Sequence, residues 1–124
     1  MPGVVAIQTN AFTTYDNAHI ELADINAHLK NFENELDQFP VIVLCDDAAF
    51  TAEKLNNFLW VTFTRSNPSH DIYGVNSFTE NKHWGCSTVI FDARIKPHNA
   101  PVLVLDEKVE KNVDEILKRA GFIK

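Results

Sequence analysis

Four consecutive aliphatic residues, Val41 to Leu44, precede Cys45 and the paired acids Asp46 and Asp47. A strand with one solvated face alternates apolar and polar residues, whereas a strand that is covered on both faces is apolar throughout. The run therefore predicts a strand inside a sheet that has helices on both sides.

Short patterns of β-branched and alternating apolar residues predict further strands at residues 4–9, 18–24, 71–75 and 88–91. In the segment 18–24, Ala18, Ile20 and Leu22 alternate and are expected to face inward. The stretch from Asn76 to Gly85 is polar and aromatic, and we expect it to be a loop.

Three segments have the spacing of amphipathic helices. Residues 26–38 carry Leu29, Phe32 and Leu36 on a narrow face, and this helix must stop before Pro40. Residues 51–64 form the second helix, with Thr51 as its expected N-cap. The third helix is expected to begin after the N-cap Asp106 and to end at Gly121 in the C′ position. Its inward residues are expected to be Val109, Val113, Ile116 and Leu117.

The helix at 51–64 is apolar on more than one side. One stripe contains Leu55, Phe58, Leu59 and Thr62, and much of the remaining surface contains Trp60, Val61 and Phe63. We therefore expect this helix to be buried against the sheet and also against a second partner.

The expected element order is β(β)αβαββα. It predicts an α/β fold with α+β character, in which a mixed β-sheet is packed by about three helices. The length of 124 residues fits one domain, and no repeat or linker divides residues 1–124.

Charge and composition exclude several functions. The chain has 11 Lys and Arg against 17 Asp and Glu, and the scattered basic residues argue against a nucleic-acid partner. The 4 glycines are too far apart for a phosphate-binding loop. The longest apolar runs, 41–45 and 101–105, are much shorter than the ~20 residues that span a bilayer. No basic region precedes the first apolar stretch, so we expect a cytoplasmic protein whose Cys45 and Cys86 stay reduced.

Asp46 and Asp47 are the first candidates for chemistry. Two carboxylates at the end of a sheet strand can hold Mg²⁺, as in receiver-like signalling domains. However, about forty residues precede this pair, whereas the acidic pair of a receiver follows its first strand. The alternative is that one of the two aspartates caps the next helix.

His83 and Cys86 are three residues apart, and Asp92 and His98 lie nearby in the sequence. This spacing suits two ligands of a zinc site, which makes a small metal-binding module a second alternative. A second Cys/His pair is missing, so simple packing of the loop around Trp84 is the competing interpretation. Farther upstream, Arg65 and Asp71 flank Pro68 and are expected to form an ion pair that holds this connection.

A set of spaced residues runs through the middle and the end of the chain: Asp46, Asp47, Trp60, Thr64, Arg65, Pro68, Asp71, Asp92 and Lys96. With these motif positions, the chain resembles the C-terminal domain of UbiD-type decarboxylases over essentially its whole length. The opening Pro2-Gly3-Val4-Val5 resembles the join into that domain.

This resemblance implies a parent enzyme that is a carboxy-lyase, with non-oxidative decarboxylation of aromatic or unsaturated acids such as polyprenyl-4-hydroxybenzoate in ubiquinone synthesis. It also implies prenylated FMN held through a divalent metal, with ligands and catalytic residues upstream of this domain. No residue here matches them, so we assign no catalytic, cofactor or metal residue and expect the isolated chain to be inactive. The motif positions are interpreted as structural or interfacial.

The resemblance further implies a domain that closes over the substrate side of the flavin site and contributes to a homo-oligomer. Its partners would be the upstream domains of the same enzyme. Phe78, His83 and Trp84 in the 76–85 loop are our candidates for the surface that faces the substrate.

Overall fold

The computed structural model describes residues 2–101, 104 and 106–124. Within these residues, a four-stranded sheet has the order β1-β2-β6-β3. Its strands are β1 (Val4–Gln8), β2 (Val41–Cys45), β6 (Thr88–Asp92) and β3 (Ile72–Val75). The first three are parallel, and β3 pairs with β6 in the antiparallel sense. The predicted mixed sheet with α+β character is therefore confirmed.

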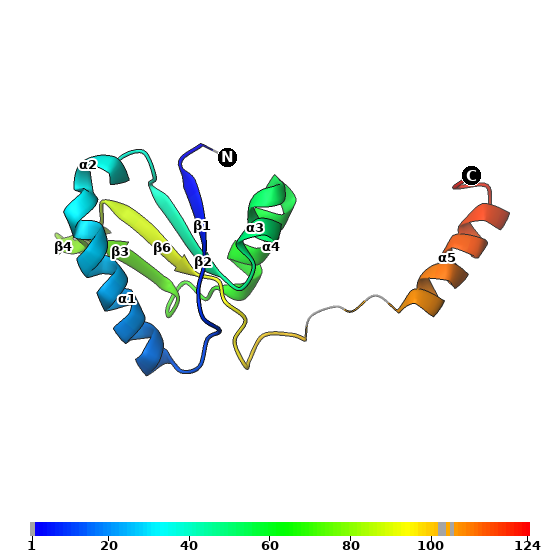
Figure 1. Ribbon diagram of the computed structural model, residues 1–124, viewed down its shortest axis with the longest axis horizontal. Helices are drawn as coiled ribbons and strands as arrows, with labels where there is room; N and C mark the ends of the chain where they lie inside the picture. The colour runs from blue at the N-terminus through cyan, green and yellow to red at the C-terminus, as the bar shows by residue number, and fades with distance from the viewer. Residues whose placement is uncertain (1, 102–103, 105) are drawn as a thin grey trace.

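Helices cover both faces of this sheet (Figure 1). One face packs against α1 (Tyr15–Leu29), and its core includes Leu22, Ile42, Leu44 and Ile90. The other face packs against α3 (Ala48–Glu53) and α4 (Leu55–Arg65), with Val43, Cys45 and Val61 between them. Because β2 contributes alternate residues to both cores, it had to be aliphatic throughout.

The predicted strand at 18–24 is wrong, because these residues lie within α1. Ala18 and Leu22 are buried and Ile20 is 63% exposed, so the relevant spacing is four residues and not two. Thr14 caps the helix by accepting a hydrogen bond from the backbone N–H of Asn17 at 3.2 Å. The predicted helix at 26–38 is correspondingly shifted. Its residues are divided between α1, the 3₁₀ turn η1 (Lys30–Phe32) and the short α2 (Glu33–Leu36).

The predicted helix at 51–64 is divided in two. Lys54 adopts extended dihedral angles (φ −153°, ψ 159°) between α3 and α4. Asp47, and not Thr51, is the N-cap of α3, and its carboxylate accepts from the Phe50 N–H at 2.8 Å. Thr51 is buried and donates to the carbonyl oxygen of Asp47.

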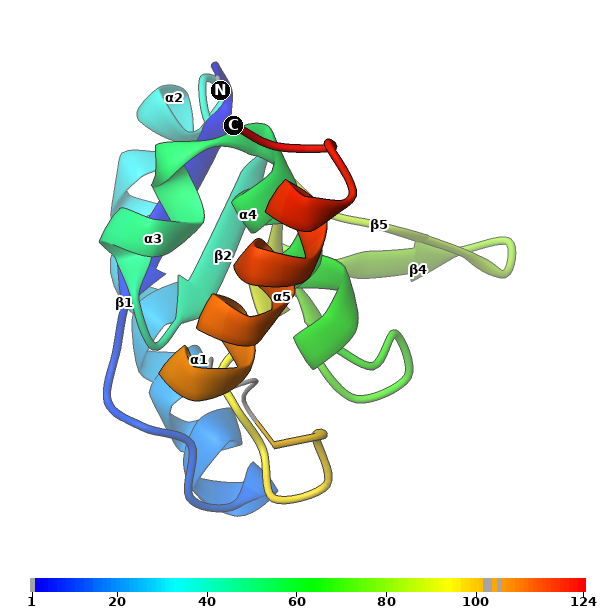
Figure 2. The ribbon, with the colours of Figure 1, turned by 90° about the vertical axis from the view of Figure 1, so that its right-hand side faces the viewer.

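The expected loop at 76–85 contains a hairpin of β4 (Phe78–Glu80) and β5 (His83–Gly85). Its turn residues, Asn81 and Lys82, both have positive φ (49° and 67°), which is the conformation of a two-residue hairpin turn. The hairpin extends sideways from the body of the molecule (Figure 2). Both cysteines are free thiols.

The last helix, α5 (Glu107–Arg119), has the expected caps. Asp106 accepts from two backbone N–H groups, and Gly121 has φ +76°. The expected inward face is wrong, because Val109, Val113 and Ile116 are exposed, Leu117 is only half-buried, and α5 lies apart from the sheet (Figure 1). No helix in the described part of the chain is long and apolar enough to cross a bilayer. Residues 102, 103 and 105 of the apolar run at 101–105 lie outside the described residues.

Candidate functional site

Charged residues gather at the end of the sheet where β2 and β6 terminate and β3 begins. Asp46 directly follows β2, Asp92 ends β6, and Asp71 directly precedes β3. Arg94 and Lys96 lie in the segment that leaves β6. Asp71, Asp92, Arg94 and Lys96 are each 2% exposed or less. We call these four residues the buried charge cluster.

Lys96 lies at the centre of this cluster. Its Nζ donates to the carbonyl oxygens of Asp92 at 2.7 Å, Arg65 at 3.2 Å and Arg94 at 3.2 Å. The same atom lies 3.4 Å from a carboxylate oxygen of Asp71 and 3.7 Å from one of Asp92. A buried ammonium requires this degree of compensation, because moving an ion from water into the protein interior costs on the order of several kcal/mol. Lys96 therefore connects β6, the start of β3 and the end of α4.

Arg94 forms a two-pronged pair with Asp92, in which Nε and Nη2 donate at 2.9 and 2.7 Å. Its Nη1 reaches Glu21 of α1 at 2.6 Å and the carbonyl oxygen of Asn10 at 3.1 Å. Phe12 lies against both cations, with its ring centroid 5.7 Å from Arg94 Cζ and 5.4 Å from Lys96 Nζ. The cluster thus ties the β1–α1 connection to the end of β6.

The charges alter the acidity of several groups. Burial by itself raises the pKa of Asp92, but hydrogen bonds from Arg94 and the charge of Lys96 outweigh burial and lower this pKa overall. The hydrogen bond to Asp92 raises the pKa of Arg94. Burial, followed by the negative charges of Asp92 and Asp71, raises the pKa of Tyr73 to about 12. Asp92 and Arg94 are therefore fixed in their charged forms and are poorly suited to proton transfer.

The expected pair between Arg65 and Asp71 is wrong. Arg65 lies 3.6 Å from Asp46, and its guanidinium is 5.1 Å from the ring centroid of Trp60. Asp71 instead faces Lys96 and accepts from the backbone N–H of Asn67 at 2.7 Å. Thr64 donates its hydroxyl proton to the carbonyl oxygen of Trp60, and Pro68 lies in the turn between α4 and β3.

The two acids after β2, Asp46 and Asp47, have different structural roles. Asp46 accepts from the backbone N–H of Ile95 at 2.7 Å and pairs with Arg65, whereas Asp47 caps α3. Both carboxylates thus already have partners, and no contact among the described residues favours the receiver-like alternative. Within the described residues, no group of three or more His, Cys, Asp or Glu side chains is arranged to hold a metal ion. Burial raises the pKa of Cys86, so its thiol is not activated as a nucleophile.

The hairpin carries the candidate substrate-side residues on an exposed surface. Phe78 is 59% exposed and Trp84 is 50% exposed, and His83 is also exposed. Phe78 packs against Gly85, and Trp84 packs against Gly74 of β3. These contacts position the hairpin rings but leave much of their surface available.

Two apolar surfaces have no cover among the described residues. The first, which we call the α3–α4 surface, consists of Phe50, Leu55, Leu59, Trp60 and Phe63. The second is the face of α5 that carries Val109, Val113 and Ile116. The prediction that the 51–64 segment packs on the sheet is confirmed, while its expected second partner is not part of this chain's described structure. Exposed apolar areas of this kind are typical of interaction sites.

Sequence reasoning missed Arg94, Glu21 and Phe12 as members of the site. The available signal was the alternation Asp92-x-Arg94-x-Lys96 directly after a strand, which places three charges at one end of the sheet. Glu21 had no such signal, because the segment 18–24 was predicted as a strand, and Phe12 lies in the connection before α1, for which the sequence predicted no element.

The fold and these contacts define an α+β domain with a buried charge cluster and exposed apolar surfaces. Comparisons with known proteins show which proteins this domain is similar to. No family model matches the chain. The chain is 36% identical over 93 residues to an uncharacterized protein of Chlamydia muridarum (strain MoPn / Nigg), which covers 74% of this chain and 16% of that protein. It is 31% identical over 83 residues to a 4-hydroxybenzoate decarboxylase subunit of Chlamydia pneumoniae. The aligned region covers 65% of this chain and 14% of that protein.

A third relative is an uncharacterized protein of Chlamydia trachomatis, with 30% identity over 95 residues that cover 76% of this chain and 16% of the relative. The matched regions thus span only 14–16% of the length of these curated relatives. The chain therefore has a distant, partial relationship to a decarboxylase subunit.

Proposed function

We propose that this chain is the C-terminal assembly and active-site-closing domain of a UbiD-type decarboxylase. The observation that carries this proposal is its 31% identity over 83 residues to a 4-hydroxybenzoate decarboxylase subunit. Five of the nine motif positions named above meet at one end of the sheet, which supports a structural role for them: Asp46, Arg65, Asp71, Asp92 and Lys96. The substrate of the parent enzyme would be an aromatic or unsaturated acid, as in ubiquinone synthesis, and the enzyme would act in the cytoplasm.

The residues of this chain do not fit the cofactor that such an enzyme implies, prenylated FMN held through a divalent metal. A metal needs several carboxylate or amide oxygens that are free to bind it. At the described end of the sheet, Asp46, Asp71 and Asp92 already have cationic partners or backbone N–H donors. The proposal therefore assigns the flavin, its metal and the catalytic residues to upstream domains of the parent enzyme.

The exposed apolar surfaces support the proposed role in assembly. Phe63 and Leu55 on the α3–α4 surface and Ile116 on α5 are each more than half exposed, at 61%, 51% and 63%. Covering such side chains is worth about 1.5–3 kcal/mol each when burial is complete. We propose that upstream domains of the same polypeptide, within a homo-oligomer, cover them.

The closing role rests on the hairpin. Phe78, His83 and Trp84 lie on two short strands that extend from the body and share a tight turn. A pocket for an aromatic acid is expected to be lined mainly by apolar and aromatic groups. We propose that this hairpin faces the substrate side of the flavin site in the intact enzyme.

A complementation experiment tests this function. The Chlamydia pneumoniae relative would be produced without its matched 83-residue region, loaded with prenylated FMN and assayed for release of CO₂ from 4-hydroxybenzoate. We expect neither the truncated relative nor this chain alone to be active, and we expect activity when both are combined. His83→Gln should reduce the restored rate, whereas the neighbouring Lys82→Gln should not. Decarboxylation or flavin binding by this chain alone would contradict the proposal.

A further inference from the structure

The strand β1 forms one edge of the sheet, and among the described residues it pairs only with β2. Just before β1, the carbonyl oxygen of Gly3 accepts a hydrogen bond from the N–H of Val41 at 3.3 Å. Just after β1, the N–H of Thr9 donates to the carbonyl oxygen of Cys45 at 3.2 Å. The backbone N–H and C=O groups of successive residues point to opposite sides of a strand. The N–H and C=O groups of Val5 and Ile7 therefore also point toward β2. Val4, Ala6 and Gln8 therefore direct their N–H and C=O groups away from the sheet. Within the described residues, these outward groups have no hydrogen-bond partner.

Within the described residues, β1 lacks three features that usually prevent an edge strand from pairing with another strand: a charged side chain, a proline and a bulge. Native edges are protected by charged side chains, by proline, by bulges or by a covering element. The strand Val4–Gln8 contains no charge and no proline, and the first charged residue after it is Asp16. Its pairing with β2 is regular over all five residues. The edge is therefore suited to accept one more strand.

We propose that the partner strand is β1 of a second copy of this chain, paired antiparallel about a two-fold axis at Ala6. In this register Ala6 faces its counterpart, and Val4 faces Gln8 of the other copy. All three outward-facing residues then oppose outward-facing residues, so every free N–H meets a free C=O. A two-fold contact must be self-complementary in this way. The sequence carries a net charge of −6, but none of that charge lies on the strand itself.

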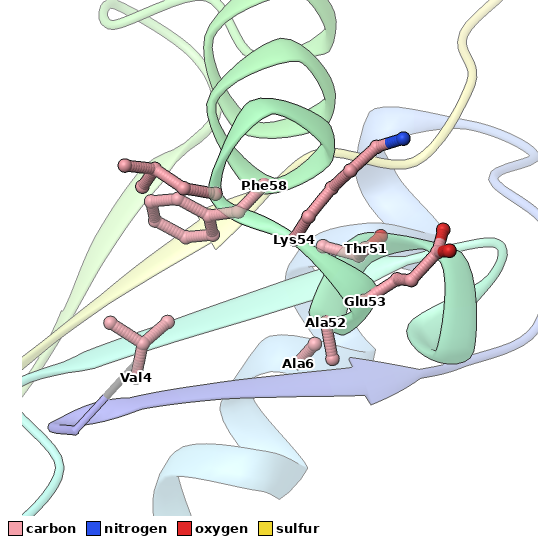
Figure 3. A pocket seen from close by; sticks show the side chains of 8 residues that line it. Val4, Ala6, Thr51, Ala52, Glu53, Lys54 and Phe58 are labelled. Atoms are coloured by element: carbon pink, nitrogen blue, oxygen red, sulfur yellow. The ribbon is translucent and has the colours of Figure 1, made fainter.

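The surface beside the strand is compatible with a second copy. A hollow of about 270 Å³ lies between β1 and the α3–α4 junction, and Val4, Ala6 and Phe58 line it (Figure 3). Glu53 and Lys54 line the same hollow, so each copy presents one acidic and one basic side chain next to the strand. Two copies related by a two-fold axis can pair these opposite charges, which supports a second copy over a strongly charged partner. This inference concerns self-association and does not depend on the proposed decarboxylase role.

Ala6→Pro tests the proposal. Proline removes the Ala6 N–H, which points away from β2, so no hydrogen bond within the sheet is lost and an edge position tolerates the change. Mass would be measured by sedimentation equilibrium over a range of concentrations of the full chain. We expect the unchanged chain to reach twice its 14.0 kDa. Loss of the two central hydrogen bonds should raise the dimer dissociation constant by about tenfold or more in the proline variant.

The matched control is Val113→Asp on α5, which adds a charge to the other exposed apolar surface and should leave the dimer unchanged. A monomer at all concentrations, or a dimer that Val113→Asp dissociates and Ala6→Pro does not, would overturn the proposal.

Amide hydrogen exchange gives a readout that does not rely on the proline variant folding. Raising the concentration of the unchanged chain should slow exchange at Val4, Ala6 and Gln8. Exchange at Val5 and Ile7, which already bond to β2, should stay constant. Equal concentration dependence at all five amides would contradict the edge-to-edge arrangement.

Discussion

Lys96 shows how one side chain can hold three segments together. Its Nζ has three carbonyl partners and lies within 4 Å of two carboxylates, all in the protein interior. Its neighbours depend on it in turn, because Asp71 and Asp92 are buried acids that would otherwise lack sufficient compensation.

Lys96→Met should therefore destabilise the fold strongly. Removing one partner of a buried ion pair leaves the other charge uncompensated, which costs about 3–5 kcal/mol. In urea unfolding, the midpoint should fall with little change in slope. Lys118→Met on the exposed part of α5 is the control and should change stability by less than about 0.5 kcal/mol. A Lys96→Met protein as stable as the control would show that the cluster contributes little.

Asp92 should make the fold sensitive to acid. Its pKa in the folded chain lies below the usual value, so the folded state binds fewer protons than the unfolded state as the pH falls. The stabilisation from Asp92 is present above the unfolded pKa of about 4 and is lost as the pH falls through the lower folded value. The free energy of unfolding of the unchanged chain and of Asp92→Asn, measured from about pH 6 to about pH 2.5, should therefore converge in acid. A difference in unfolding free energy between the two proteins that stays constant over this pH range would show that the charge of Asp92 is not the source of the stabilisation.

At the scale of elements, β3 and the hairpin meet at a close contact. A Cβ atom on Gly74 would lie 2.5 Å from Cys86 Cβ and 2.7 Å from Trp84 Cζ2. Atoms this close must move apart, and Cys86 Cβ is held directly by the backbone. Gly74 is thus required by the approach of the hairpin and not by an unusual backbone angle.

Gly74→Ala should destabilise the protein by about 1–3 kcal/mol, as expected for overpacking. Near-ultraviolet circular dichroism should also change, because Trp84 must shift. Ser77→Ala, at an exposed position before β4, is the matched control and should have little effect on either measurement. Unchanged stability and spectrum for Gly74→Ala would mean that the hairpin is not held against β3.

The elements also show which sequence signals were reliable. The aliphatic run of β2 was correctly predicted because its burial on both faces leaves a single interpretation. The segment 18–24 was not, because Ala18, Ile20 and Leu22 fit a period of two as well as a helix, and only packing of Leu22 and Ile25 on the sheet decides between them. No residue pattern predicts the division of the 51–64 helix at Lys54, since lysine is a good helix former.

For the site, sequence reasoning found the acids but not their partners. Asp46, Asp71 and Asp92 stand next to strands, so their location at one end of the sheet followed from the order of elements. The choice of Lys96 over Arg65 as the partner of Asp71 depends on the path of the chain after β6, which brings Lys96 back under α4. No local pattern encodes that path.

At the scale of the whole molecule, the sheet with its covering helices, which we call the body, differs from α5 in how completely its apolar residues are buried. The body has two cores on opposite faces of its sheet, whereas α5 has an exposed apolar face. If the chain is a domain of a larger enzyme, the missing contacts should appear as extra stability when that partner is added.

The remainder of the Chlamydia pneumoniae relative should therefore raise the melting temperature of this chain. Binding to the folded state alone stabilises by about 2.7 kcal/mol at a hundredfold excess over the dissociation constant. Differential scanning calorimetry would measure the shift, with an unrelated protein at the same concentration as the control. Equal melting temperatures with and without the relative would argue against the proposed partnership, whatever the outcome of the activity assay.

The buried charge cluster also has a mechanical consequence. Arg94 and Lys96 belong to the segment between β6 and α5, and both side chains are fixed inside the body. Any tension applied through α5 would reach Lys96 and Arg94 before it reached the backbone hydrogen bonds of β6. The load would thus be shared with α1 through Glu21, with the end of α4 through Arg65 and with the start of β3 through Asp71. A domain whose last helix is held by a moving partner could in this way transmit force to the entire sheet without peeling β6 away from its neighbours.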